Sequence, residues 1–163
     1  MRPNGFEIAR VRAYAGRESG AGLALESASA MEAEVRPLNS ERPGCVTIAL
    51  GDGRGDVPIV GVDIARGVAV EIAYAMGAHL AADTPATIVG VAGNVRVRRA
   101  DGSEYFSADD IGFQIYGSGR RGEWYIYLER RGPGKTVEAS LALHFDGQNA
   151  LMLAELLRTM PFR

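Results

Sequence analysis

The sequence contains very little cysteine and histidine, and it has no long apolar run. Cys45 is the only cysteine among the 163 residues, so no disulfide can form within the chain and a reducing, cytoplasmic location is expected. The two histidines, His79 and His144, lack the close spacing of metal ligands. No stretch approaches the roughly 20 consecutive apolar residues of a membrane-spanning helix, and the first residues do not have the pattern of a secretory signal. We therefore expect no metal site and no membrane association.

Lysine is also scarce, because Lys135 is the only one among 18 basic residues. These are balanced by 20 acidic residues, for a net charge of −2, so bulk electrostatics do not point to a partner. The hydrophobic fraction of 47% is that of an ordinary folded protein. We predict a single domain over residues 1–163, with halves at about 1–83 and 84–163.

Three motifs of catalytic or nucleotide-binding proteins fail in this sequence. The glycine-rich segment Gly51–Asp56 has Asp56 where G-x-G-x-x-G needs glycine. Gly134-Lys135-Thr136 resembles the end of a phosphate-binding loop, but Glu129 stands where that loop needs its first glycine. No Gly-x-Ser-x-Gly elbow occurs. We therefore predict no catalytic residue and no cofactor, and an enzyme that uses Cys45 or a histidine is the third choice of function.

The first half combines short strand patterns with one amphipathic helix. Alternating or apolar stretches predict four strands, at Phe6–Tyr14, Leu23–Glu26, Met31–Arg36 and Val46–Leu50. Apolar residues spaced by four predict a helix with one buried stripe, formed by Ile64, Val68, Ile72, Met76 and Leu80. We expect the Asp63 carboxylate to cap this helix and the segment at residues 83–85 to end it.

The second half has a clearer strand pattern. It predicts strands at Thr87–Val91, Val95–Arg99, Glu104–Phe106, Ile111–Tyr116, Trp124–Arg130 and Val137–Phe145. Asp101-Gly102 is a strong hairpin signal. A two-residue turn there would pair Arg99 with Glu104, Arg98 with Tyr105, and Val97 with Phe106.

A final helix is expected between Asp146, as its cap, and Pro161. Its apolar residues include Met152 and Leu156, which widen the stripe beyond a single face. Monomeric proteins rarely expose large apolar patches, so we expect a homo-oligomer, at least a dimer.

Together these patterns predict the α+β class. The chain would form two strand-rich halves, each an antiparallel sheet closed by one helix, and the order of strands followed by a helix would occur twice as a pseudo-repeat.

Strand alternation divides the second half into two sheet faces. The apolar set would face the core: Val95, Val97, Phe106, Ile111, Phe113, Ile115, Trp124, Ile126, Leu128, Leu141, Leu143 and Phe145. The opposite set is polar and aromatic: Arg96, Arg98, Tyr105, Gln114, Tyr116, Tyr125, Tyr127, Glu129, Glu138 and His144. Four of the six tyrosines belong to this second set.

Tyrosines interleaved with arginines on an open sheet are typical of surfaces that bind single-stranded nucleic acid, because bases stack on the rings while guanidinium groups follow the phosphates. The candidate residues for nucleic-acid or partner binding are Arg96, Arg98, Tyr105, Tyr116, Arg120, Arg121, Tyr125, Tyr127, Arg130, Arg131 and Lys135. The same rings suit a subunit interface or an ordinary strand surface, with Arg98 over Tyr105 as a cation–π pair. A protein-interaction or self-assembly module is therefore the alternative to a non-catalytic nucleic-acid-binding protein.

The expected order of four antiparallel strands followed by a helix, in each half of the chain, resembles the Whirly and PUR-type single-stranded DNA-binding families. The resemblance is strongest from Thr87 to Met160, with the turn Gly132–Lys135 before the last strand and Asp146 at the start of the helix. It implies that the sheet binds single-stranded nucleic acid. The chain departs from the lysine-rich strand signature of the Whirly family, so no family site residue is carried over.

Overall fold

The computed structural model describes residues 5–8, 10–15, 31–36, 44–51, 60–82, 86–99 and 101–160. The first half contains β1 (Gly5–Ile8), β2 (Arg10–Ala15), β3 (Met31–Arg36), β4 (Cys45–Gly51), β5 (Val60–Ala65) and α1 (Arg66–Ala81). The second half contains β6 (Ala86–Arg99), β7 (Glu104–Tyr116), β8 (Glu123–Arg131), the 3₁₀ turn η1 (Pro133–Lys135), β9 (Val137–Asp146) and α2 (Gly147–Thr159). The predicted strand at Leu23–Glu26 and the predicted helix end at residues 83–85 lie outside the described residues.

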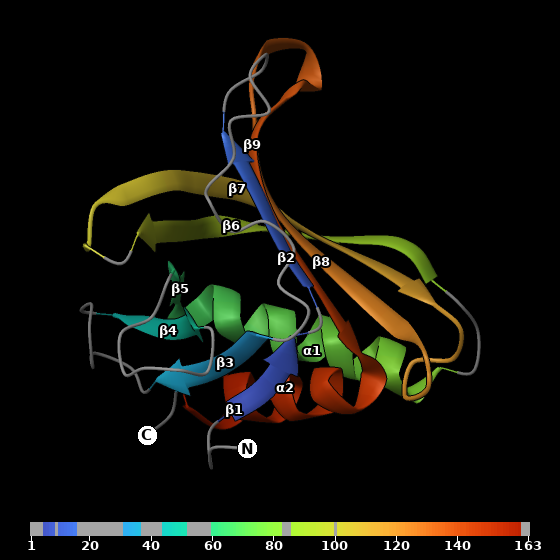
Figure 1. The fold of residues 1–163 in the computed structure, drawn as a ribbon. Helices are drawn as coiled ribbons and strands as arrows, with labels where there is room; N and C mark the ends of the chain where they lie inside the picture. The colour runs from blue at the N-terminus through green and yellow to red at the C-terminus, as the bar shows by residue number, and fades with distance from the viewer. Residues whose placement is uncertain are drawn as a thin grey trace.

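The nine described strands form one antiparallel sheet in the order β1-β3-β4-β5-β6-β7-β8-β9-β2 (Figure 1). The α+β class and the order of strands followed by a helix, twice, are confirmed. The two halves do not form separate sheets, however, because β5 pairs with β6 from Val60 to Ile64 and joins them. The sheet is not closed, and the consecutive strands β1 and β2 lie at its two ends.

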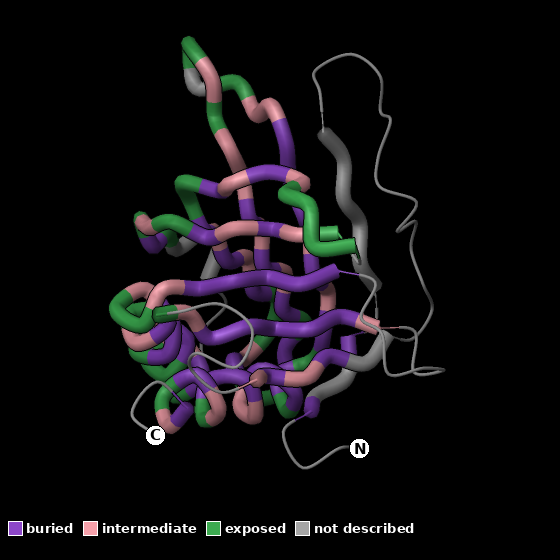
Figure 2. Tube along the Cα trace, turned by 90° about the vertical axis from the view of Figure 1, so that its left-hand side faces the viewer, coloured by how far each residue is buried: buried purple, intermediate pink, exposed green. Residues whose placement is uncertain are grey.

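Both helices cover one face of the sheet and pack against each other (Figure 1). Every apolar side chain of the second half that alternation assigns to the core is buried; Trp124, Val97 and Leu141, for example, have no exposed surface. Figure 2 shows buried and half-buried positions alternating along strands of the second half, whereas β4 and β5 are buried almost throughout. The opposite face of β6 to β9 is called the outer face below.

The start of the first helix was predicted wrongly. Asp63 does not cap it: Asp63 lies in the middle of β5, fully inside the sheet, and α1 begins after Ala65 without a side-chain cap. The alternation of valine and isoleucine with smaller or polar residues continues through Ile64, so the strand extends further than the helical spacing suggested. Ile72, Met76 and Leu80 of the predicted stripe are buried on α1 as expected, whereas Val68 is half-buried and Ile64 belongs to β5.

The final helix follows its prediction more closely. Asp146 is the N-cap of α2, and its carboxylate accepts a hydrogen bond of 2.8 Å from the backbone amide of Asn149. Met152 and Leu156, which made the predicted apolar stripe wide, are half-buried and pack against the core. A contact within the chain thus accounts for part of that width, and the homo-oligomer stays a prediction.

The hairpin between β6 and β7 has a different register from the predicted one. The amide of Arg99 donates to the carbonyl of Ser103 and that of Gly102 donates to the carbonyl of Arg99, with Gly102 at φ +88°. This is the pattern of a three-residue loop that ends in a glycine bulge, rather than a two-residue turn. Val97 pairs with Phe106 as predicted, but Arg98 pairs with Glu104 and not with Tyr105. Hydrogen bonds from Ser103 lower the pKa of the exposed Asp101.

Candidate binding face

The outer face carries a continuous array of aromatic rings. Tyr125 lies at its centre and stacks on His144 with ring centroids 4.3 Å apart and planes 3° apart. Tyr127 lies nearly parallel to Tyr125 at 6.4 Å, and Tyr116 meets Tyr125 edge-on at 5.6 Å. These four residues, called the aromatic ladder below, come from three adjacent strands, because β8 pairs with β7 on one side and with β9 on the other.

The rings of the ladder contact one another and are also accessible to solvent. Its inner rings are half-buried, whereas Tyr116 is 52% exposed. His144 was not among the predicted binding residues, although alternation placed it on the outer face. The signal that could have revealed it is the pairing of β8 with β9, which sets His144 directly opposite Tyr125. Long-range pairing of this kind is hard to derive from one sequence.

Four predicted phosphate-binding arginines on or beside the outer face form ion pairs with carboxylates. The pairs are Arg96–Glu104 at 3.0 Å, Arg98–Asp63 at 2.5 Å, Arg130–Glu138 at 3.5 Å and Arg131–Glu129 at 2.6 Å. Arg131 also lies 3.6 Å from Asp110. These arginines therefore do not form a row of uncompensated positive charge.

Arg98 belongs to a buried cluster rather than to an open surface. It donates to the two Asp63 oxygens from Nε (2.5 Å) and from Nη2 (2.9 Å), and Thr47 Oγ1 donates to Asp63 at 2.7 Å. The Asp63 side chain is fully buried. Gly61 makes room for the guanidinium, since a Cβ there would lie 2.9 Å from Arg98 Nη2. The cation–π contact expected for Arg98 is instead made by Arg99, 4.6 Å from the Tyr105 ring.

Arg120 and Arg121 are exposed in the turn between β7 and β8. Among the described residues, no ion pair forms with either. The turn is held against both helices: the Gly119 amide donates to the Ala82 carbonyl and the Gly147 amide donates to the Gly122 carbonyl. The turn directly follows Tyr116, so both arginines lie in the loop that leaves the strand end carrying this ring. Lys135 lies in η1, and its side chain is outside the described part of the molecule.

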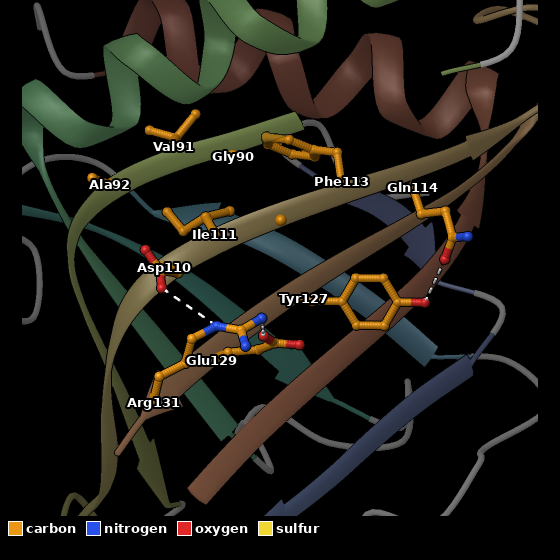
Figure 3. Close-up of a pocket in the computed structure, with 11 residues that line it drawn as sticks. Gly90, Val91, Ala92, Asp110, Ile111, Phe113, Gln114, Tyr127, Glu129 and Arg131 are labelled. Carbon is orange, nitrogen blue, oxygen red and sulfur yellow. Dashed lines mark hydrogen bonds and ion pairs between the residues drawn. The ribbon is translucent and has the colours of Figure 1, made fainter. Parts of the chain in front are cut away.

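A hollow of about 500 Å³ opens beside the ladder (Figure 3). Its lining from the described residues is Gly90, Val91, Ala92, Asp110, Ile111, Gly112, Phe113, Gln114, Tyr127, Glu129 and Arg131. Figure 3 shows Tyr127 and Gln114 at one end and Asp110, Glu129 and Arg131 at the other. The Tyr127 hydroxyl donates to Gln114 Oε1 at 3.3 Å. This hollow could not be predicted from the sequence, because it depends on Gly90 and Gly112, which pair only in the folded sheet.

The described residues offer few other candidates for a metal-binding or catalytic site. No group of three or more His, Cys, Asp or Glu side chains there is placed to hold a metal ion. Cys45 is half-buried at the start of β4. Neither described helix is long and apolar enough to cross a membrane.

Comparison with known proteins gave no relative: no family model, no curated protein and no solved structure matches the chain. The Whirly and PUR-type likeness therefore stays a resemblance in the order of elements.

Proposed function

We propose that this chain is a non-catalytic binding protein for single-stranded nucleic acid, and that the aromatic ladder is its base-stacking surface. The supporting observation is the ring array of Tyr116, Tyr125, Tyr127 and His144 on the sheet face opposite the helices. Every base has a flat face, so a row of rings can stack successive bases whatever their sequence, at about 1–3 kcal/mol per base.

Stacking has to supply most of the affinity in this proposal. The outer-face arginines already neutralise carboxylates, and the whole chain has a net charge of −2. Arg120 and Arg121, at the Tyr116 end of the ladder, are the cations best placed to meet phosphates. Each neutralised phosphate contributes about −0.7 to the slope of log affinity against log salt for a single strand, so two would give a slope of about −1.4.

A protein partner is the second candidate, and one observation favours it. Tyr116 and Tyr74 are the exposed large hydrophobic residues of the described chain, and Tyr74 is 72% exposed on α1. Aromatic residues with little free charge are typical of the centre of protein interfaces. A protein-interaction or self-assembly module would use the same outer face, or the helix side around Tyr74.

The test is fluorescence anisotropy with labelled single strands of about 12 nucleotides, a length suited to such sites, at low salt and then over a salt series. We expect micromolar or tighter binding. Tyr125→Leu combined with Tyr127→Leu keeps apolar bulk but removes the flat rings, and should weaken binding at least tenfold. Tyr125→Phe combined with Tyr127→Phe keeps the rings and should preserve binding. Thermal melting of all variants shows whether a loss of binding reflects unfolding.

The matched control is Tyr74→Leu, because it is the same change at an exposed tyrosine on the helix side. It should leave oligonucleotide binding unchanged. Arg120→Gln combined with Arg121→Gln should flatten the salt dependence, whereas Arg158→Gln on α2 should not. Absence of binding at low salt would contradict the proposal, and analytical ultracentrifugation would then test self-assembly.

A further inference from the structure

Two glycines create the hollow beside the ladder. Gly90 in β6 pairs directly with Gly112 in β7, and Gly112 pairs with Tyr127 in β8. No described residue lies within 4 Å of where a Cβ on Gly90 would stand, and a Cβ on Gly112 would only touch Tyr127 at 3.9 Å. Neither glycine is therefore required by a neighbouring side chain among the described residues.

Glycine weakens the interior of a strand, and it often marks a place where a ligand approaches the backbone. Here both glycines lie well inside strands of 14 and 13 residues. Because neither residue has a side chain, their backbones line the hollow directly. The volume of about 500 Å³ falls within the range of small-molecule sites.

The two ends of the hollow differ in chemistry. The Tyr127 ring, which is also part of the ladder, offers a flat wall to an aromatic ligand. At the other end lie two carboxylates, Asp110 and Glu129, and one guanidinium, Arg131. This end has a formal charge of −1, so it repels a phosphate and favours a group that donates hydrogen bonds.

We propose that the hollow binds one nucleobase that bears an exocyclic amino group, packed against Tyr127 with its amino edge toward Asp110 and Glu129. The inference rests on the proposed function, because Tyr127 joins the hollow to the ladder. A strand stacked on the ladder would insert one such base and gain a preference for cytosine or adenine over uracil or thymine. The same chemistry would also accept a free nucleoside.

The decisive comparison is between oligo-deoxycytidine and oligo-deoxyuridine of about 12 nucleotides. Their bases are pyrimidines of similar stacking strength, and only cytosine carries the amino group. We expect the cytidine strand to bind about tenfold more tightly, which is the effect of one good hydrogen bond to a charged group. Equal affinity for the two strands, together with no binding of free nucleosides, would overturn the inference while leaving the ladder intact.

Gly90→Val is the filling variant, because its side chain enters open space and valine suits a strand. It should remove the preference for cytidine, leave the weaker binding of the uridine strand unchanged, and melt no lower than the parent. Asp110→Asn should reduce the preference without filling the hollow. Gly77→Ala adds a methyl group in open space on α1 and should change neither strand's affinity. A preference that survives Gly90→Val would refute the site.

Titration calorimetry with free cytidine and uridine separates this inference from the proposed function. If no oligonucleotide binds but cytidine does, and Gly90→Val abolishes that binding, the hollow stands as a nucleoside site and the single-strand proposal fails. If oligonucleotides bind without any base preference and cytidine does not bind, the proposed function stands and the base pocket fails. Loss of both kinds of binding overturns both.

Discussion

The sheet face turned away from the helices has two ends that use similar residues in opposite ways. Across β4 to β6, Thr47, Asp63 and Arg98 satisfy one another and are buried or nearly so. Across β7 to β9, the rings of the ladder stay half-exposed and border an open hollow. Polar and aromatic residues that face away from the helices are therefore not all exposed to solvent. One end is packed within the protein, and the other is open to solvent.

The two ends differ in whether a side chain occupies the space beside their glycines. Gly61 in β5 leaves room for the guanidinium of Arg98 from β6. This guanidinium passes over Gly61 and binds Asp63, which is also in β5. Gly90 and Gly112 leave room that no described side chain fills. The same residue type thus permits internal packing at one end and an open hollow at the other.

The largest expected effect comes from breaking the buried cluster. Asp63→Asn removes the fully buried carboxylate that the Arg98 guanidinium contacts, and the Arg98 side chain is only 17% exposed. Removing one partner of a buried ion pair costs about 3–5 kcal/mol, and we expect a loss of unfolding free energy near the lower end of that range. Urea denaturation measures this loss. An unchanged slope m would show that the variant still unfolds in the same two-state transition as the parent.

Asp110→Asn at the open end is the matched control for this change. Asp110 is 53% exposed and lies 3.6 Å from Arg131, so its loss should alter the unfolding free energy by no more than about 0.5 kcal/mol. If the two variants lost similar stability, the distinction between the two ends would be wrong.

Filling the glycines gives the next largest effect. Gly61→Ala places a methyl group 2.9 Å from Arg98 Nη2, and the guanidinium cannot move away without weakening its bonds to Asp63. Overpacking of this kind costs about 1–3 kcal/mol. Gly112→Ala meets only an ordinary contact at 3.9 Å and should be neutral or slightly stabilising. Thermal melting of the pair checks the contrast, and a destabilised Gly112→Ala would show that its site is packed rather than open.

The local burial pattern of the second half can be predicted from the sequence, but most of its long-range strand pairing cannot. Alternation assigned Phe113, Trp124 and Phe145 to the core correctly, because period-two burial is a local property of a strand on a covered sheet. Asp146 was identified as a cap for the same reason, since its partner lies three residues away.

Asp63 shows why other predictions failed. Its position before an apolar stripe suggested a cap, but its partner is Arg98, 35 residues further along the chain. The bulge at Tyr105 shifted the expected pairing of Arg98 in the same way. The stacking of Tyr125 on His144 and the hollow over Gly90 and Gly112 likewise depend on strand register, which one sequence does not specify.

A smaller effect is expected at the centre of the ladder. Tyr125→Leu removes the ring contacts with His144, Tyr127 and Tyr116 while keeping apolar bulk. Aromatic pairs contribute about 0.5–1.5 kcal/mol beyond their buried area, and these rings are only half-buried, so we expect a loss of about 1 kcal/mol by urea denaturation. A loss as large as that of Asp63→Asn would mean that the ladder is a structural core rather than a binding surface.

The smallest loss of stability is expected for Arg96→Gln, which can be compared with Arg98→Gln two residues further along β6. Arg96→Gln removes an ion pair with Glu104 in which both side chains are largely exposed, at 40% and 49%. Such pairs contribute between 0 and about 1 kcal/mol, so the variant should melt close to the parent. Arg98→Gln is chemically the same change, but it removes the guanidinium that donates to the buried Asp63 carboxylate, and it should lower the unfolding free energy by several kcal/mol. Burial is the main difference between the two positions, because strand, residue type and partner charge are shared. Equal melting temperatures for the two variants would therefore show that the Asp63 cluster is no more structural than the open end.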